Sequence, residues 1–145
     1  MGNPLAAALA SALLALTILT GCGASEEDRA ADAAERFARA GTVNDYETFC
    51  DLLTEGARAP IEQFGRRLDV PADQRCSAAL EAQGGTEQPD AEVEIGTVEV
   101  DGETASVQVS TTLPGKEPDD RVLQLQQDDS GDWLVADYGV VAPGT

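Results

Sequence analysis

The chain has 145 residues, 42% of them hydrophobic, and a formal net charge of −18 at pH 7. This length suits one domain with one hydrophobic core, and so acidic a surface excludes the usual nucleic-acid binders, which need Lys and Arg against phosphate. The charge also disfavours docking onto anionic lipid, and it indicates either a surface kept soluble by repulsion or one that meets a cationic protein partner.

An uncharged run near the start of the chain, residues 5–19, indicates a secretion signal. Its 15 residues are too few for a helix that crosses a bilayer, which takes about 20, and they fit the apolar region of a signal peptide. The run ends in Leu19-Thr20-Gly21-Cys22. This motif resembles the bacterial lipobox, in which a Leu and two small residues precede the Cys that receives a diacylglyceryl group. Residues 1–4 contain no Lys or Arg, whereas such leaders normally begin with positive charge.

The lipobox resemblance implies a lipid-anchored envelope lipoprotein. Residues 1–21 would be the signal peptide that is removed, residues 22–25 a lipidated tether with its lipid on Cys22, and residues 26–145 a single domain. That domain would lie on the extracytoplasmic face of the cell membrane, with the membrane as its partner through the lipid. An ordinary cleaved signal peptide with an unmodified Cys22, or an uncleaved anchor, is the alternative.

The cysteine count agrees with export. If Cys22 carries lipid, Cys50 and Cys76 are left as one pair in an oxidising setting, where disulfides persist. Helical periodicity points both side chains inward. We therefore predict a Cys50–Cys76 disulfide, with free, buried thiols as the alternative.

Capping signals and helical periodicity predict two helices before residue 54. The first begins at an N-cap, Ser25, and ends near Gly41. The second begins at Asn44, where Glu47 would complete a capping box. The residues expected to point inward are Ala30, Ala34, Phe37 and Ala38 in the first helix, and Tyr46, Phe49, Cys50 and Leu53 in the second.

Two further helices are predicted up to residue 86. One opens with Pro60 near its first turn and is broken by Val70-Pro71. The other is short and is stopped by Gly84-Gly85. Their inward residues are Ile61, Phe64 and Leu68 in the third helix, and Cys76, Ala79 and Leu80 in the fourth.

From residue 91 on, apolar residues alternate with polar ones, which predicts four antiparallel strands. The phase of the alternation reverses at Gly96-Thr97, which indicates a β-bulge. Asp101-Gly102 predicts a two-residue hairpin turn. The return strand carries Ala105, Val107 and Val109, the third strand covers residues 122–126, and the fourth covers residues 133–140.

Helices followed by strands indicate an α+β domain, with the N-terminal helices packed on one face of a curved antiparallel sheet of about four strands. The Asp45-Tyr46 pair in the helical half, the bulged hairpin with its Val-Asp-Gly turn and the final strand GDWLVADYG resemble the nuclear-transport-factor-2-like (cystatin-like) fold. That resemblance implies a cone around a cavity. Some enzymes of the fold place an Asp base and a Tyr donor inside it, and Asp45-Tyr46 and Asp137-Tyr138 are the pairs of that kind here.

The residues nonetheless favour a non-catalytic binding or scaffolding domain without a metal or cofactor. The chain has no His, so imidazole metal sites and Ser–His or Cys–His nucleophiles are excluded. Neighbours on a strand face opposite ways, so Asp137 and Tyr138 should not share a cavity. The residues expected to line either a closed core or a pocket for a small apolar ligand are Phe37, Tyr46, Phe49, Trp133 and Val135. A small isomerase-like or cyclase-like enzyme with an Asp/Tyr pair, and a module that binds or inhibits a protein partner, are the alternatives.

Overall fold

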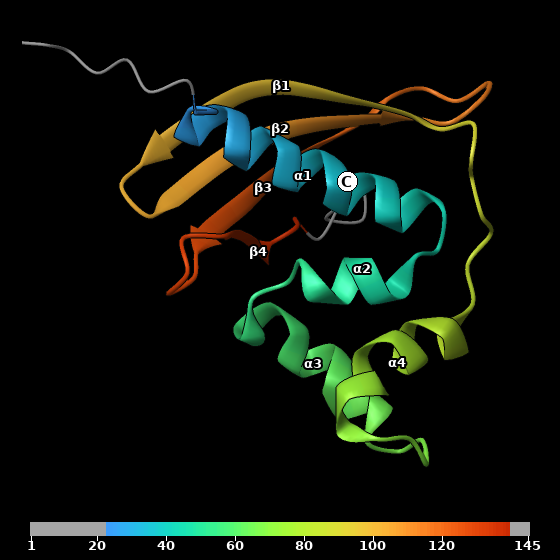
Figure 1. Ribbon diagram of the computed structural model, residues 1–145. Coiled ribbons are helices and arrows are strands. Elements are labelled where there is room, and N and C mark those ends of the chain that lie inside the picture. The colour runs from blue at the N-terminus through green and yellow to red at the C-terminus, as the bar shows by residue number, and fades with distance from the viewer. Residues whose placement is uncertain (1–22, 140–145) are drawn as a thin grey trace, which may run out of the picture.

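The computed structural model describes residues 23–139, with helices in the first half and strands in the second (Figure 1). The predicted signal peptide, the lipid site Cys22 and Val140, the predicted end of the last strand, lie outside these residues. The helices are α1 (Glu26–Thr42), α2 (Tyr46–Asp51), α3 (Glu55–Gly65), the short 3-10 helix η1 (Ala72–Gln74) and α4 (Arg75–Gln83). The strands are β1 (Glu92–Asp101), β2 (Thr104–Thr112), β3 (Asp119–Gln127) and β4 (Trp133–Asp137).

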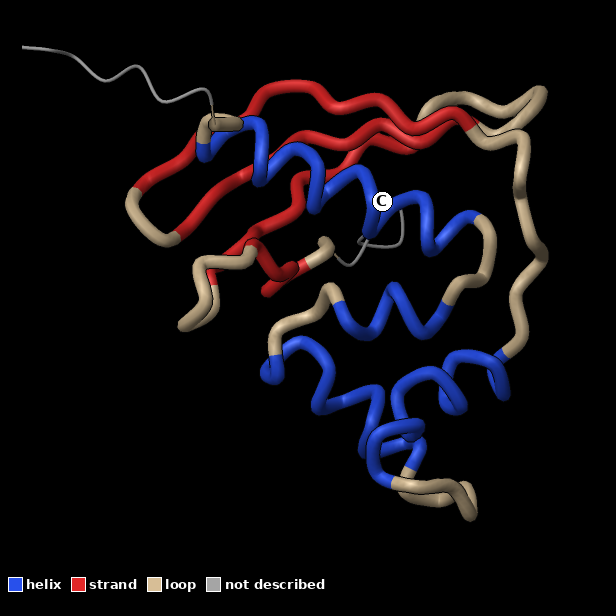
Figure 2. The backbone as a smooth tube through the Cα atoms, in the orientation of Figure 1, coloured by secondary structure: helices blue, strands red, loops and turns tan. Residues whose placement is uncertain are grey.

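The strands form one antiparallel sheet in the order β1-β2-β3-β4. The sheet is curved, and the helices gather on one side of it (Figure 2). Helix α1 packs against all four strands, whereas α4 packs mainly on α2 and α3. The predicted α+β class, with helices on one face of a four-stranded sheet, is therefore confirmed.

The start of α1 follows from its sequence. The Ser25 side chain accepts a hydrogen bond from the Asp28 N–H (3.1 Å), and the Asp28 carboxylate accepts one from the Ser25 N–H (3.2 Å). This capping box satisfies backbone donors that the helix cannot. The inward face is mostly alanine, so the helix backbone comes close to the sheet; its buried residues are Ala30, Ala33, Ala34, Phe37 and Ala40. Ala38 is half-buried, and the helix continues one residue beyond the predicted Gly41.

Helix α2 begins one residue later than predicted. Asp45 is its N-cap and accepts a hydrogen bond from the Thr48 N–H (3.2 Å), so Glu47 makes no capping box. Asn44 instead takes a left-handed conformation (φ 57°), which Asn tolerates better than most residues. Its amide donates to the carbonyl of Gly85 (3.0 Å), and this contact joins the start of α2 to the chain that leaves α4.

The segment after α2 covers the open edge of the sheet. Leu53 lies beyond the helix and bridges to Val135 as a parallel neighbour of β4. The Val135 N–H donates to the Leu52 carbonyl (2.7 Å), and the Thr54 N–H donates to the Val135 carbonyl (3.0 Å). These bonds pair backbone groups of an edge strand that would otherwise be free for association.

Helix α3 differs from its prediction in position and in its buried face. It begins after the N-cap Thr54, so Pro60 lies in its interior rather than in its first turn. It ends at Gly65, well before Val70-Pro71, and Phe64 is 41% exposed. Phe64 is exposed because α3 crosses α4 closely at Gly65, and this crossing sets which face of α3 is covered. A Cβ on Gly65 would lie 2.1 Å from the carbonyl oxygen of Arg75. Ile61 packs against the core as predicted, while Leu68 is half-buried beyond the helix end.

The predicted disulfide is present and joins α2 to α4. Cys50 and Cys76 are both buried, and their Cα atoms are 6.1 Å apart. Gly84, with φ 69°, ends α4 at the predicted place. The disulfide therefore holds the α3–α4 pair to the rest of the domain.

The sheet confirms the first bulge and adds a second. The β1–β2 register shifts between Ile95 and Val98, as predicted from the change of phase. The tight turn is one residue later than expected, because Asp101 still pairs with Thr104 and Gly102, with φ 62°, is the first loop residue. A second shift lies in the β3–β4 pairing. Leu125 faces Val135 and Gln124 faces Asp137, so Ala136 is the extra residue.

Candidate functional site

The residues predicted to line a core or pocket separate into two groups along α1. Trp133 and Val135 face the helices as expected and are 4% and 0% exposed. Phe37 and Phe49 pack together farther along α1, with ring centroids 4.3 Å apart. Tyr46 does not join them: it is half-buried, and its hydroxyl lies beside Gly85, where an added Cβ would be 2.7 Å away.

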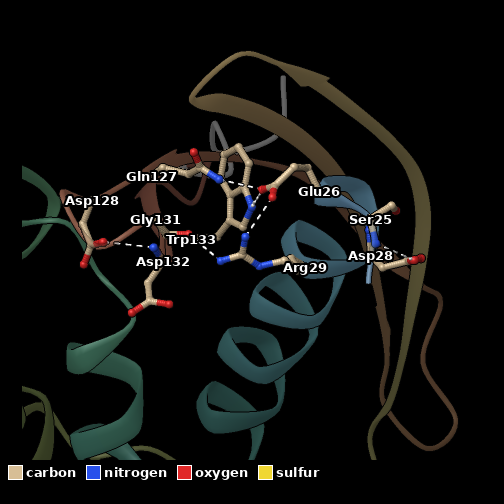
Figure 3. Close-up of polar contacts among 9 residues, drawn as sticks. All are labelled: Ser25, Glu26, Asp28, Arg29, Gln127, Asp128, Gly131, Asp132 and Trp133. Carbon is tan, nitrogen blue, oxygen red and sulfur yellow. Dashed lines mark hydrogen bonds and ion pairs between the residues drawn. The ribbon is translucent and has the colours of Figure 1, made fainter. Parts of the chain in front are cut away.

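Trp133 belongs to a polar cluster with Glu26, Arg29 and Gln127, and this cluster joins the start of α1 to the β3–β4 hairpin (Figure 3). One carboxylate oxygen of Glu26 accepts hydrogen bonds from the Trp133 indole N–H (3.0 Å) and the Gln127 amide (2.6 Å). The other oxygen pairs with Arg29 (2.8 Å), whose second nitrogen donates to the Gly131 carbonyl (2.6 Å). Trp133 is thus fully engaged in packing and hydrogen bonding, and we assign it a structural role.

A groove beside this polar cluster has a volume of about 660 Å³. Half of the residues that line it are charged; they are Asp28, Arg29, Asp32, Arg36, Asp51 and Asp132. About half of the groove's surface is polar, and it carries solvated charges of both signs. The groove is therefore a weaker candidate for a ligand site than a smaller hollow at the other end of α1.

That smaller hollow, here called the aromatic hollow, has a volume of about 320 Å³. It lies between the second half of α1, the residue Phe49 of α2, and the inner face of β2 and β3. The residues that line it are Phe37, Ala38, Gly41, Thr42, Phe49, Val109, Thr111, Asp119, Arg121, Leu123 and Tyr138. Most of its surface is apolar, and its volume is at the lower end of the range for small-molecule sites.

Three aromatic rings form one side of the hollow. Phe37 and Phe49 are stacked, and the ring of Tyr138 lies 5.8 Å from Phe37 and 6.1 Å from Phe49, centroid to centroid. Regular alternation from Trp133 and Val135 would place Tyr138 on the opposite face of the strand. The bulge at Ala136 reverses the alternation, so that Asp137 is exposed and Tyr138 points inward.

An ion pair lies at the polar end of the hollow. Both Nε and Nη2 of Arg121 contact the same oxygen of Asp119, at 2.8 and 2.6 Å. The two residues share a face because they are two apart on β3, and they are paired in register with Thr111 and Val109. Their side chains are 47% (Asp119) and 41% (Arg121) exposed, so a ligand can reach them.

Asp119 and Arg121 are not among the site residues predicted from the sequence, because the third strand was predicted to begin at residue 122. The signal was present, since alternation carried backward from Leu125 and Leu123 places Arg121 and then Asp119 on the same inward face. Strand β3 in fact begins at Asp119. Three extra residues of strand thus supply the polar end of the hollow.

Neither predicted Asp–Tyr pair enters the hollow together. Asp45 is used as a helix cap, and Asp137 is exposed and accepts a hydrogen bond from the Gly139 N–H (2.9 Å). The acidic residue that does share the hollow with Tyr138 is Asp119, and its carboxylate is engaged by Arg121. A hydrophobic floor with a paired polar end is an arrangement suited to binding.

The rest of the described chain offers few other chemical centres. Across residues 23–139 no group of three or more His, Cys, Asp or Glu side chains is arranged to hold a metal ion. At the acidic turn after β3, a carboxylate oxygen of Asp128 accepts the N–H groups of Ser130 and Asp132 (2.8 and 2.9 Å), as in an ordinary turn. Within the same range, every helix falls short of the length and apolar character needed to cross a membrane.

Fold and site together define a small α+β domain with an internal disulfide and a mostly apolar hollow between its first helix and its sheet. The sequence matches no protein-family model, and no curated protein matches it.

Proposed function

We propose that the protein is a lipid-anchored lipoprotein of the cell envelope, non-catalytic, whose domain binds a small and mostly apolar ligand in the aromatic hollow. The observation that carries the proposal is the hollow itself: about 320 Å³, walled by three aromatic rings and open to solvent at one polar end. Small-molecule sites are typically concave and mostly apolar with a few polar groups, so an apolar hollow of this size favours a ligand.

Gly41 supports this assignment. A Cβ at this position would lie 3.7 Å from the ring of Phe49, which is an ordinary contact, so packing does not require glycine here. Glycine still stabilises the last turn of a helix less than alanine does, although Gly41 is the second-last residue of α1 and the cost is smaller there than in the middle. The absence of a side chain at position 41 therefore keeps space open in the wall at some cost to helix stability.

Filling the hollow at Gly41 tests the ligand proposal. We expect Gly41→Leu to place its side chain against Phe49 and to lower the affinity for indole, a neutral water-soluble probe, at least tenfold. Gly56→Leu is the matched control, because Gly56 is an exposed helical glycine whose added Cβ would meet only Thr54, at 4.0 Å. Saturation-transfer NMR and calorimetry would be run on the protein in nanodiscs, with empty nanodiscs as the blank. Equal binding by the two variants, or no binding to the wild type, would refute the proposal.

The anchor rests on the lipobox and is supported by the disulfide. The Leu19–Cys22 motif follows an uncharged run, and a Cys50–Cys76 bridge agrees with an oxidising compartment outside the cytoplasm. Only three residues separate Cys22 from the start of α1 at Glu26, a reach of about 10 Å. A lipidated domain with so short a tether would lie close to the membrane.

Replacing Cys22 with alanine tests the anchor. In a bacterial host, we expect the wild-type protein to partition into detergent and Cys22→Ala to be released or left unprocessed, because the thiol that accepts lipid is gone. Phase partition and intact-mass analysis measure the two forms. A wild-type mass that corresponds to an unmodified N-terminus at residue 22 would contradict the lipoprotein assignment.

A second candidate function, docking of a cationic protein partner, is supported by the distribution of charge. Residues 55–83, which hold α3 and α4, contain four Arg and five acidic residues, a net charge of −1, so the remaining chain carries −17. The outer face of β1 is a prominent part of this acidic body; its exposed acidic residues are Glu92, Glu94, Glu99 and Asp101. A cationic partner would approach this surface rather than the α3–α4 pair.

A further inference from the structure

We propose that the ligand of the aromatic hollow is a small zwitterion with an apolar body, of the chemical class of the free apolar amino acids. This inference rests on the proposed function, because it assumes that the hollow binds a ligand at all. It adds which polar groups that ligand carries and where they lie.

The polar end of the hollow presents one cation and one anion side by side. Arg121 uses Nε and Nη2 for one oxygen of Asp119, and the shorter of these contacts is 2.6 Å. Among residues 23–139, no hydrogen bond reaches the other Asp119 oxygen or Nη1 of Arg121. The pair therefore keeps one acceptor and one donor nitrogen free for a ligand without having to separate.

This arrangement favours adjacent opposite charges over a single charge. The ion pair has no net charge. A lone carboxylate would be attracted by Arg121 and repelled by Asp119, and a lone ammonium would be attracted by Asp119 and repelled by Arg121. A zwitterion places its carboxylate toward Arg121 and its ammonium toward Asp119. Because the two protein groups touch, only a ligand whose charged groups lie close together matches both, as in an α-amino acid, where both groups are attached to one carbon.

The net charge of the whole protein also favours a ligand that carries no net charge. At −18, the domain repels small anions from its surface, so a purely acidic amphiphile would bind against the field. A ligand with no net charge is not repelled. The pair is about half exposed, so its geometry adjusts readily to an arriving ligand.

The remainder of the hollow is apolar and would contact the apolar body of the ligand. Val109 and Leu123 form part of the sheet side, and Phe37, Phe49 and Tyr138 supply aromatic surface. A volume of about 320 Å³ accommodates side chains from leucine to the aromatic amino acids while the charged end stays at Asp119 and Arg121.

The experiment compares four related compounds on the wild-type protein in nanodiscs by calorimetry. L-phenylalanine carries both charges, phenethylamine only the ammonium, 3-phenylpropanoate only the carboxylate and 2-phenylethanol neither. We expect L-phenylalanine to bind at least tenfold more tightly than each of the other three. Binding of 2-phenylethanol or of either singly charged compound as tightly as L-phenylalanine would overturn the zwitterion inference and leave the proposed hollow in place. If none of the four binds, both the inference and the proposed function fail.

Charge-matched variants separate the local pair from the general field. We expect Asp119→Asn and Arg121→Gln each to lose at least tenfold in affinity for L-phenylalanine. Glu117→Gln and Lys116→Gln make the same changes of net charge in the loop before β3, outside the hollow, and should remain within twofold of the wild type. Equal losses in the loop variants and the hollow variants would overturn the assignment to Asp119 and Arg121.

Discussion

Replacing both Cys50 and Cys76 with alanine is expected to lower the free energy of unfolding by about 3.5 kcal/mol, the chain-entropy estimate for a loop of about 27 residues. The two cysteines are 26 positions apart and link α2 to α4. Such a loss is a large share of the about 5–15 kcal/mol that stabilises a typical domain. Urea unfolding followed by circular dichroism measures it.

We expect the loss of the disulfide to loosen mainly the α3–α4 pair. Helix α4 packs mainly on α2 and α3, so without the disulfide the α3–α4 pair loses its cross-link to α2 and is held by packing and by its chain connections alone. Amide hydrogen exchange should therefore increase most in residues 75–83 and least in β2 and β3. The wild-type protein under reducing conditions is the control and should behave like the double variant. A change in unfolding free energy below about 1 kcal/mol would show that the bridge contributes little.

Trp133→Ala is expected to destabilise the domain by about 3–5 kcal/mol, the usual cost of removing a large buried aromatic side chain. Trp133 is 4% exposed, and its indole N–H donates to Glu26 at the start of α1. The substitution leaves a cavity between α1 and β4 and removes one of the bonds that hold the first turn of the helix. Thermal or urea unfolding must be followed by circular dichroism, because Trp133 is the only tryptophan.

Two further variants make the Trp133 prediction specific. Trp133→Phe keeps most of the apolar volume and loses the hydrogen bond, so its cost should be clearly smaller. Leu134→Ala alters the neighbouring, half-buried residue on the other face of β4 and should also cost less. Because Trp133 does not line the aromatic hollow, a folded Trp133→Phe protein should bind indole as the wild type does. Loss of indole binding in that variant would move the site away from the hollow.

Much of the fold was predictable because its signals are local. The capping box of Ser25 and Asp28 sets the start of α1, and the alternation of Val93, Ile95 and Val98 sets both the strand and its bulge. Caps and alternation depend on contacts within a few residues, so they are readable without knowledge of the partner elements.

The errors in the predicted ends and faces of the helices also have local causes, but these causes are visible only in the backbone structure. Asn44 and Asp45 both favour N-caps, and only the left-handed conformation of Asn44 leaves the cap to Asp45. Periodicity placed Phe64 inward, whereas the crossing of α3 with α4 at Gly65 sets which face is covered. Backbone conformation and packing therefore determine which residue caps α2 and which face of α3 is covered.

The sequence by itself determined the class of the fold, the order of its elements and the pairing of its two described cysteines. Tertiary structure decided the candidate site. The bulge that points Tyr138 inward arises in the pairing of β4 with β3, and the strand extension that places Asp119 and Arg121 beside it depends on pairing with β2. Local alternation can place Asp119 and Arg121 on one face of β3, but register is set between strands, so no local pattern could bring Tyr138 to them. The hollow exists because α1, α2 and the sheet meet there without filling the space, which is a property of their packing.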